Sequence, residues 1–441
     1  MIAFMRISKG PEEFIPLDNA ALIYPPTIAR FNSNVFRLSF DVDIAVIPER
    51  LLKALNNIMV RFPYYKVSLH NGFFWYYLTQ HEKPLEVYPD RSYPCAYFNR
   101  HRSANGYLFK VMYREDRIAV EYFHALTDGT GGLIFLKSLV AEYLRLSGIE
   151  VGDDPQVFKI NTPINEEESA DSFQKFFFPI KSVMESDVRA FHVTALSADL
   201  TDRTNAITAM VSVSDMKLIA SEFQATITEY LTAELLDAYQ RIQQQRVSSS
   251  KRYKPIRISV PVNIRRVFDS KSMRNFTLFV VVGIDPRLGA YSFTEIIEQV
   301  KYQLRNGVNT KSLSRQISRN VAGGRNVLVR YAPNFLKRPF MKILSDRYGD
   351  RLYSSVISNL GNVSLPSGMA EHVTQGNFFL SPSKALKISM GVMGIHSSLS
   401  INISSNLKTD TVVEREFLTA LVNRGIAVEI ASNRTDSMVA R

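Results

Sequence analysis

The chain contains very little cysteine: Cys95 is the only one among 441 residues. No internal disulfide can form, which is typical of proteins from a reducing compartment and predicts a cytoplasmic location. Long apolar runs are also missing: no stretch of about 18 uncharged apolar residues occurs, so we expect no transmembrane helix. The first residues, MIAFMRISKGPEEFIPLD, reach proline and acidic residues before any continuous apolar segment, so we expect no secretory signal.

Several kinds of catalytic site lack their sequence pattern. The seven histidines are scattered, with no HExxH, HxH or cysteine pair, so we expect no metal site. No GxSxG sequence is present to hold the serine of a hydrolase. The glycines of DGTGG do not fit a dinucleotide-binding fingerprint, because Ile134 occupies the position of the last glycine in that motif. They do not fit a phosphate-binding loop either, because no Gly-Lys follows them. Cys95, in SYPCAYF, is predicted to be a small core residue rather than a nucleophile.

Positive charge is in excess, with 53 Lys and Arg against 42 Asp and Glu, a formal net charge of +11. Such a balance favours anionic partners such as phosphorylated cofactors, acidic carrier proteins or anionic lipid. The basic residues are densest in 315–351, which is interpreted either as a solvated helix face or as a surface for peripheral contact with an anionic membrane. No nucleic-acid motif accompanies them, so we expect no nucleic-acid partner.

Strand-like and helix-like segments alternate along the whole chain, which predicts an α/β protein. Strands are expected at 34–43, 64–69, 73–78, 107–113, 117–124, 191–200, 206–214, 255–264, 276–285, 353–361, 375–382, 386–395 and 398–406. Helices are expected at 47–63, 133–148, 216–223, 226–245, 292–306 and 412–425, and further helix is expected between 306 and about residue 345. The aromatic stretch GFFWYYL, 72–78, is interpreted as a core strand, with the lining of an acyl channel as the alternative.

An acidic, polar stretch divides the chain into two similar halves. Residues 149–190 contain GDDPQ and NEEESADS, a composition typical of a connection. We therefore predict a first lobe at 1–165, a connecting segment at 166–190 and a second lobe at 191–441.

One short motif carries chemistry: HALTDG, residues 124–129, lies between a predicted strand and a predicted helix. A neutral histidine, with an unperturbed pKa of about 6.5, can accept a proton from a hydroxyl, amine or thiol. Asp128 can brace the loop or bind a distant arginine, and Gly129 allows a tight turn. The structural alternative is a histidine at a strand end and an aspartate in a turn.

This motif and several other segments resemble the chloramphenicol-acetyltransferase-like superfamily. HALTDG is similar to its HxxxDG signature. LDNAALIYPP, RFPYYKVSLHNGFFWYYL, PVNIRR, RNFTLFV and SNLGNVSLP look most like its alcohol acetyltransferase branch. The superfamily also contains condensation domains and the BAHD plant acyltransferases. The resemblance covers most of the chain, although HxxxDG is its only specific catalytic motif.

The resemblance implies two sheet-plus-helix lobes forming a V with a central tunnel. It implies His124 as the general base on an acceptor that attacks a thioester carbonyl. It implies Asp128 as a structural brace paired with an arginine of the second lobe, with Arg265 as the expected partner and Arg266 as the alternative. Gly129 would complete the turn. No tightly bound cofactor is implied, because acyl-CoA or an acyl-carrier-protein thioester serves as co-substrate.

The sequence also departs from parts of the superfamily. Peptide-forming condensation domains usually carry two adjacent histidines, whereas Phe123 precedes His124 here. The BAHD sequence DFGWG is absent, and SNLGN occupies a comparable late position. Its Ser358 and Asn359 are candidates either for binding an oxyanion or for supporting the joint between the lobes.

The leading hypothesis is an acyltransferase that moves an acyl group from a CoA or carrier-protein thioester to a small-molecule alcohol or amine. One alternative is a non-catalytic binder of a carrier protein or lipid intermediate. Another is a stand-alone peptide-forming condensation enzyme, which the missing second histidine disfavours.

Overall fold

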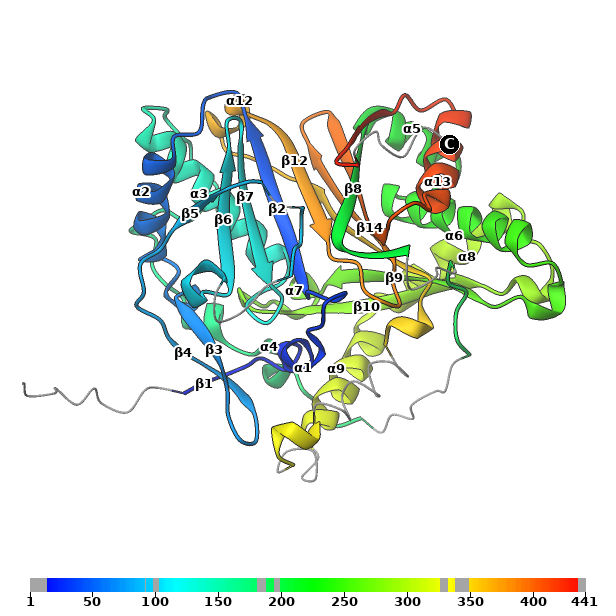
Figure 1. Cartoon of the computed structure of the whole chain (residues 1–441), viewed down its shortest axis with the longest axis horizontal. Helices are drawn as coiled ribbons and strands as arrows, with labels where there is room; N and C mark the ends of the chain where they lie inside the picture. The colour runs from blue at the N-terminus through cyan, green and yellow to red at the C-terminus, as the bar shows by residue number, and fades with distance from the viewer. Residues whose placement is uncertain are drawn as a thin grey trace, which may run out of the picture.

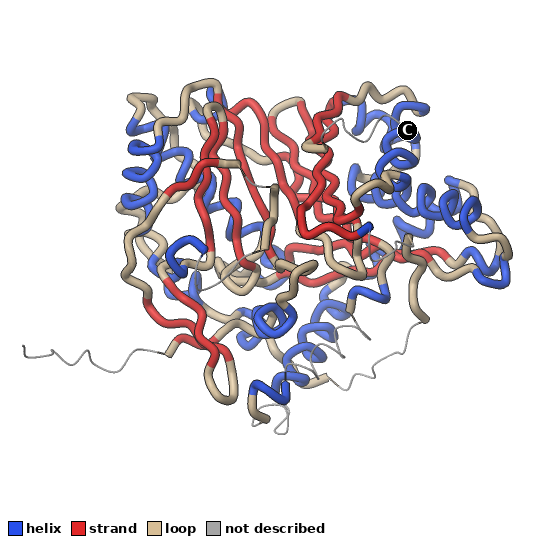
Figure 2. Tube along the Cα trace, in the orientation of Figure 1, coloured by secondary structure: helices blue, strands red, loops and turns tan. Residues whose placement is uncertain are grey.

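The computed structural model describes residues 14–91, 93–97, 103–180, 188–193, 199–325, 332–337 and 349–434. They form two sheet-plus-helix lobes side by side, in the predicted V (Figure 1). Figure 2 shows the strands gathered in the middle of the molecule with helices on both outer sides. The predicted α/β class is confirmed.

A five-stranded sheet with the order β12-β2-β7-β6-β5 forms the first lobe. Its strands are β2 (Val35–Val42), β5 (Val87–Pro89), β6 (Phe109–Arg114), β7 (Arg117–Phe123) and β12 (Val373–Leu380). Helices α2 (Pro48–Met59) and α3 (Gly129–Leu146) pack against each other on one side of this sheet (Figure 1). The apolar residues of α2 recur at helical spacing and form its buried face, with Leu51, Leu55 and Ile58 in the core.

A small sheet, β1-β4-β3, extends the first lobe, and in it the strands expected at 64–69 and 73–78 pair as an antiparallel hairpin. Its strands are β1 (Ile15–Pro16), β3 (Val67–Asn71) and β4 (Tyr76–Gln80). The predicted strand 73–78 is wrong at its start, because the turn occupies 72–75, where the N–H of Gly72 donates to the carbonyl of Trp75 at 2.9 Å. Phe73 and Trp75 are 66% and 48% exposed on this turn, so they line neither the core nor a channel.

A seven-stranded sheet with the order β10-β9-β11-β13-β14-β8-β15 forms the second lobe. Its strands are β8 (Leu200–Ser212), β9 (Ile256–Asn263), β10 (Thr277–Ile284), β11 (Ser355–Asn362), β13 (Ile388–Ile395), β14 (Ser398–Leu407) and β15 (Glu429–Ser432). Its helices are α5 (Val213–Glu222), α6 (Ile227–Arg246), α8 (Phe293–Gly307), α9 (Thr310–Arg325) and α13 (Val412–Asn423). The described residues also contain short α-helices: α1 (Tyr24–Thr27), α4 (Ser172–Lys175), α7 (Arg265–Phe268) and α12 (Met369–His372).

One strand corrects the predicted lobe boundaries. β12, residues 373–380, falls within the segment 191–441 assigned to the second lobe, yet it pairs antiparallel with β2 at the edge of the first sheet. Phe378 and Val373 are accordingly part of the first lobe's core. The alternation of residues along a strand specifies which face is buried but not which strand pairs with it. The sequence pattern therefore did not indicate that β12 joins the sheet of the first lobe.

Two other expected elements differ from the structure. Residues 188–193 have no regular structure and 194–198 lie outside the described residues. Of the described part of the expected strand 191–200, only Leu200 lies in a strand, as the first residue of β8. In the basic region 315–351, α9 ends at Arg325, and 326–331 and 338–348 lie outside the described part of the chain. Peripheral membrane contact through this region stays a prediction. Among the described residues, no helix has both the length and the apolar character needed to cross a bilayer.

Candidate active site

The HALTDG motif forms the joint between β7 and α3, as predicted. Asp128 is the N-cap of α3, where its carboxylate accepts hydrogen bonds from the N–H groups of Thr130 and Gly131, both at 3.2 Å. Because this cap satisfies the free N–H groups of the first turn, the helix begins at Gly129 rather than at the predicted residue 133.

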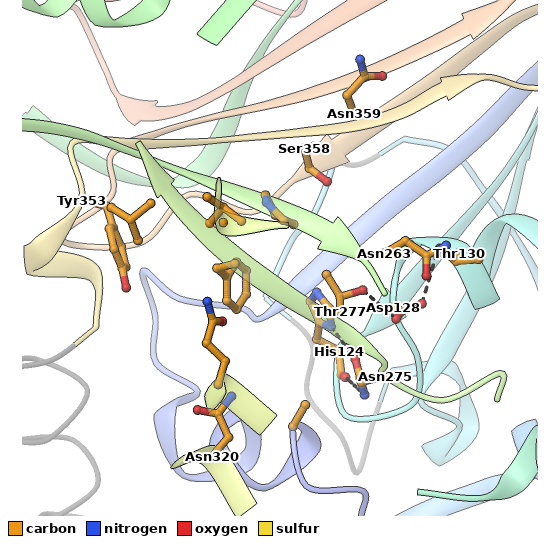
Figure 3. Close-up of a pocket in the computed structure, with 18 of the residues that line it drawn as sticks. His124, Asp128, Thr130, Asn263, Asn275, Thr277, Asn320, Tyr353, Ser358 and Asn359 are labelled. Atoms are coloured by element: carbon orange, nitrogen blue, oxygen red, sulfur yellow. Dashed lines mark hydrogen bonds between the residues drawn. The ribbon is translucent and has the colours of Figure 1, made fainter. Parts of the chain in front are cut away.

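A cavity of about 1130 Å³ opens beside this joint, and both lobes line it. His124 and Asp128 lie at its first-lobe wall, and residues of β9, β10, β11, α8 and α9 form the opposite side. Figure 3 shows His124, Asp128, Asn275 and Thr277 gathered together, with Asn320 and Tyr353 across the cavity. The cavity occupies the place at which the resemblance implies a tunnel.

Asp128 joins the two lobes through its carboxylate. Arg265 of α7 donates from Nη1 to Oδ2 at 2.9 Å and from Nη2 to Oδ1 at 3.0 Å. The backbone N–H of Phe276 and the hydroxyl of Thr277 also donate to Oδ2, at 2.8 and 2.9 Å. Arg265, the expected partner, thus makes the contact, whereas the alternative Arg266 is exposed.

These contacts keep Asp128 ionised. Burial opposes ionisation, but the Arg265 guanidinium and the hydrogen bonds from Phe276 and Thr277 hold the pKa of Asp128 below its ordinary value of 3.8. Both oxygens are occupied by donors, and no hydrogen bond joins the carboxylate to the His124 ring among the described contacts. The aspartate therefore has the surroundings of an interlobe brace rather than of a proton carrier.

The His124 ring is held on several sides. Its Nδ1 lies 3.1 Å from Oδ1 of Asn275. Tyr24 stacks on it, with centroids 4.6 Å apart and planes at 15°, and Phe36 packs at 5.0 Å in a tilted arrangement. Burial lowers the pKa of His124 below its ordinary 6.5, against opposing contributions from Asn275 and the charge of Asp128. At neutral pH the imidazole is therefore uncharged and able to accept a proton.

Gly129 and Gly131, at the start of α3, allow the lobes to approach closely. A Cβ at Gly131 would overlap the hydroxyl of Thr127 and the carbonyl oxygen of Met273 in the second lobe. At Gly129 it would lie 3.2 Å from Leu360, a tight but less severe contact. The sequence predicted a tight turn at Gly129, and of these two glycines Gly131 has the closer contacts.

Gly131→Ala is therefore expected to destabilise the protein, because its methyl group would overlap both the Thr127 hydroxyl and the backbone carbonyl oxygen of Met273. We expect a loss of about 1–3 kcal/mol in the free energy of unfolding, the usual cost of overpacking. Gly323→Ala in α9 is the matched control, since nothing lies within 4 Å of its Cβ position and alanine favours a helix. Denaturant melts of both variants measure the difference, and equal stability would contradict the close approach.

Ser358 and Asn359 lie on β11, at the cavity wall. Asn359 is engaged within the second lobe: its Nδ2 donates to the hydroxyl of Thr228 at 3.0 Å, and its Oδ1 accepts from the N–H of Gly361 at 2.7 Å. These bonds tie the start of α6 to an irregularity in β11, so both hydrogen bonds of the Asn359 side chain lie within the second lobe. The Ser358 side chain lies on the cavity side of the strand in Figure 3.

Three residues near His124 were missed by motif analysis: Asp18, Tyr24 and Asn275. The first two lie in LDNAALIYPP and the third in RNFTLFV, segments that carry the resemblance but no catalytic signature. An amide and a carboxylate 257 residues apart follow no spacing rule, so only the fold reveals that they meet.

Cys95 is buried, as predicted, and burial raises the pKa of its thiol well above the ordinary value. The described residues contain no group of three or more His, Cys, Asp or Glu side chains arranged to hold a metal ion.

Comparison with known proteins supports the fold. No family model and no curated protein sequence matches the chain. Among solved structures, a variant of the starter condensation domain of the rhizomide synthetase RzmA with C8-CoA is 12% identical, with a TM-score of 0.58 over 92% of this chain and 93% of that one. TRI101 of F. graminearum with coenzyme A and deoxynivalenol is 11% identical, with a TM-score of 0.60 over 93% of this chain and 97% of that one.

A third similar structure is the epimerization domain from the third module of tyrocidine synthetase B. It is 12% identical, with a TM-score of 0.59 over 94% of this chain and 96% of that one. The chain thus has the fold shared by condensation domains and TRI101, and the predicted resemblance is confirmed at the level of fold. Since an epimerization domain has the same fold, the reaction has to be argued from the site.

Proposed function

We propose that this protein is an acyltransferase that moves an acyl group from a thioester, with CoA as the first candidate donor, to a hydroxyl or amine acceptor. The observation that supports this most is His124: it is uncharged at neutral pH, held by Asn275 and Tyr24, and borders a cavity that both lobes line. The similar structures solved with C8-CoA or coenzyme A make CoA the donor to test first.

In the proposed reaction, His124 removes the proton of the acceptor as its oxygen or nitrogen attacks the thioester carbonyl carbon. A tetrahedral intermediate with a negatively charged oxygen forms. It collapses with cleavage of the carbon–sulfur bond, and the imidazolium returns its proton to the leaving thiolate. We assign Ser358, on the cavity side of β11, as the candidate donor to the oxyanion. Asp128 takes no proton and holds the loop that carries His124.

This reaction is tested by release of free thiol. Acyl-CoA thioesters from short to long chain, and an acylated carrier protein, are each incubated with a mixed pool of small alcohols and amines. Release that requires both donor and acceptor, and that disappears in His124→Ala, supports transfer. No release above a heat-treated control for any donor would contradict it.

The alternatives predict different results with the same reagents. A non-catalytic binder would retain a carrier protein or acyl thioester without turnover, and His124→Ala would leave that binding unchanged. A peptide-forming enzyme would use an aminoacyl carrier as acceptor in preference to free alcohols or amines. Phe123 in place of a second histidine disfavours it.

The activity should depend on pH through His124. Because burial lowers the pKa of this group in the folded protein, we expect kcat/KM to fall only below pH 6.5 as the imidazole gains a proton. The folded state binds fewer protons here than the unfolded state, so this group also makes the protein less stable as pH falls through 6.5 toward the folded pKa. Initial rates measured across a range of pH, with an acceptor that does not itself titrate in that range, show where kcat/KM begins to fall. A fall that begins above pH 6.5 would contradict the assignment of His124 as the base.

A further inference from the structure

Asn275 contacts His124 at two points from the second lobe, just before β10. Its Oδ1 lies 3.1 Å from the ring Nδ1, and its Nδ2 donates to the backbone carbonyl of His124 at 3.0 Å. A carbonyl oxygen can only accept hydrogen bonds, so the nitrogen end of the amide must face it. The oxygen end must then face the imidazole.

This orientation determines the tautomer of His124. Because Oδ1 of Asn275 has no proton to donate, the contact with Nδ1 is a hydrogen bond only if Nδ1 carries the hydrogen. In the neutral ring Nε2 is then the nitrogen with the free lone pair. Stacking by Tyr24 restrains the plane of the same ring.

A buried carboxylate holds Asn275 in turn. Oδ2 of Asp18 accepts from the Nδ2 of Asn275 at 3.1 Å, and Oδ1 accepts from the N–H of Ala21 at 2.8 Å. Asp18 and Asn275 are 1% and 2% exposed, so neither side chain can exchange this partner for bulk water. Arg274 lies beside Asp18 and donates to the carbonyl of Pro16 at 2.9 Å, which anchors the segment that carries the aspartate.

We propose that Asn275, held by Asp18, is a positioning residue that fixes His124 as the Nδ1-protonated tautomer and leaves Nε2 as the base. The catalytic consequence depends on the proposed function, whereas the tautomer does not. Three separate parts of the chain meet in this contact, and His124 is presented correctly only when the second lobe is in place.

Nitrogen-15 NMR of histidine-labelled protein tests the tautomer directly. The His124 signals are assigned by their absence in His124→Ala. At a pH above 7 we expect the shift pattern of a neutral ring with hydrogen on Nδ1. Hydrogen on Nε2 in the unmodified protein would overturn the proposal, and this measurement needs neither a positioning variant nor activity.

Asn275→Ala tests the cause. Without the amide, both tautomers become accessible, so the Nδ1-protonated signal should give way to a mixture. For transfer, kcat should fall about tenfold to a hundredfold, the range for partners that orient a functional group, with KM for the donor nearly unchanged. An unchanged shift pattern, or an unchanged kcat, would overturn the proposal.

The matched control is Asn402→Ala, in β14. Asn402 is also fully buried and hydrogen-bonded, with its Oδ1 accepting from Thr208 at 3.0 Å, but it does not line the cavity. It should lower stability as Asn275→Ala does and leave the His124 signals and kcat unchanged. If the tautomer is as expected and no thioester is consumed, the positioning contact stands and the proposed function fails.

Discussion

His124→Ala is expected to lower turnover by about a hundredfold to ten-thousandfold, the range for a general acid–base group. Alanine cannot take the acceptor's proton, so the attacking group would have to lose it to water. Donor binding should persist, because the ring forms only part of a large cavity wall. Initial rates at saturating donor and acceptor, together with donor affinity by calorimetry, measure the two effects separately.

A second histidine provides the control. The Nδ1 of His372 lies 2.7 Å from Oδ1 of Asp43, away from the cavity lining. His372→Ala should leave kcat and KM unchanged. Full activity in His124→Ala would remove the general-base mechanism, and comparable losses in both variants would point to folding rather than chemistry.

Asp128→Asn is expected to cost both stability and activity. The asparagine side chain has an NH₂ group where the aspartate has a second oxygen, so one oxygen that now accepts hydrogen bonds would be replaced by a donor facing other donors. The substitution would also leave the buried Arg265 without its counter-ion. Breaking such a pair costs about 3–5 kcal/mol. Since the pKa of Asp128 is lowered in the folded state, its stabilising contribution is present above pH 3.8 and is lost as pH falls further. Denaturant melts at neutral pH and initial rates measure the loss.

An exposed ion pair is the matched control. Asp116 is half exposed and pairs with Arg114 at 2.9 Å, in a turn remote from the cavity. Because water screens such pairs, Asp116→Asn should leave the melt almost unchanged. If Asp128→Asn has the same stability and the same turnover as the unmodified protein, the Asp128 carboxylate does not brace the two lobes.

Local sequence patterns predicted the individual elements well and their assembly less well. The helical spacing of Leu51, Leu55 and Ile58 in α2 and the short turn that joins β6 to β7 each depend on residues close together in the sequence. By contrast, Phe73 and Trp75 have the aromatic character of a core strand but lie on a turn, where Gly72 allows the backbone to close. β-propensity describes which side chains fit a strand, and the need for the chain to reverse direction overrides that preference at this turn.

The candidate site divides in the same way. His124 and Asp128 are four residues apart, so one short pattern identified both. The resemblance supplied Arg265, whose contact with Asp128 depends on how the second lobe docks. Asn275 could not be inferred, because its role comes from the direction of two atoms of an amide toward a ring and a carbonyl. Geometry of that kind is absent from composition and spacing.

The pairing of β12 with β2 has a consequence for how the chain is made. The segment before residue 191 leaves the ribosome well before residues 373–380, which complete the first sheet. Until they arrive, β2 has an open edge of unpaired N–H and C=O groups, a surface prone to pairing with other chains. Contacts this distant in sequence also form slowly. A separately produced first half should therefore aggregate, and the nascent protein depends on its late strand to close that edge.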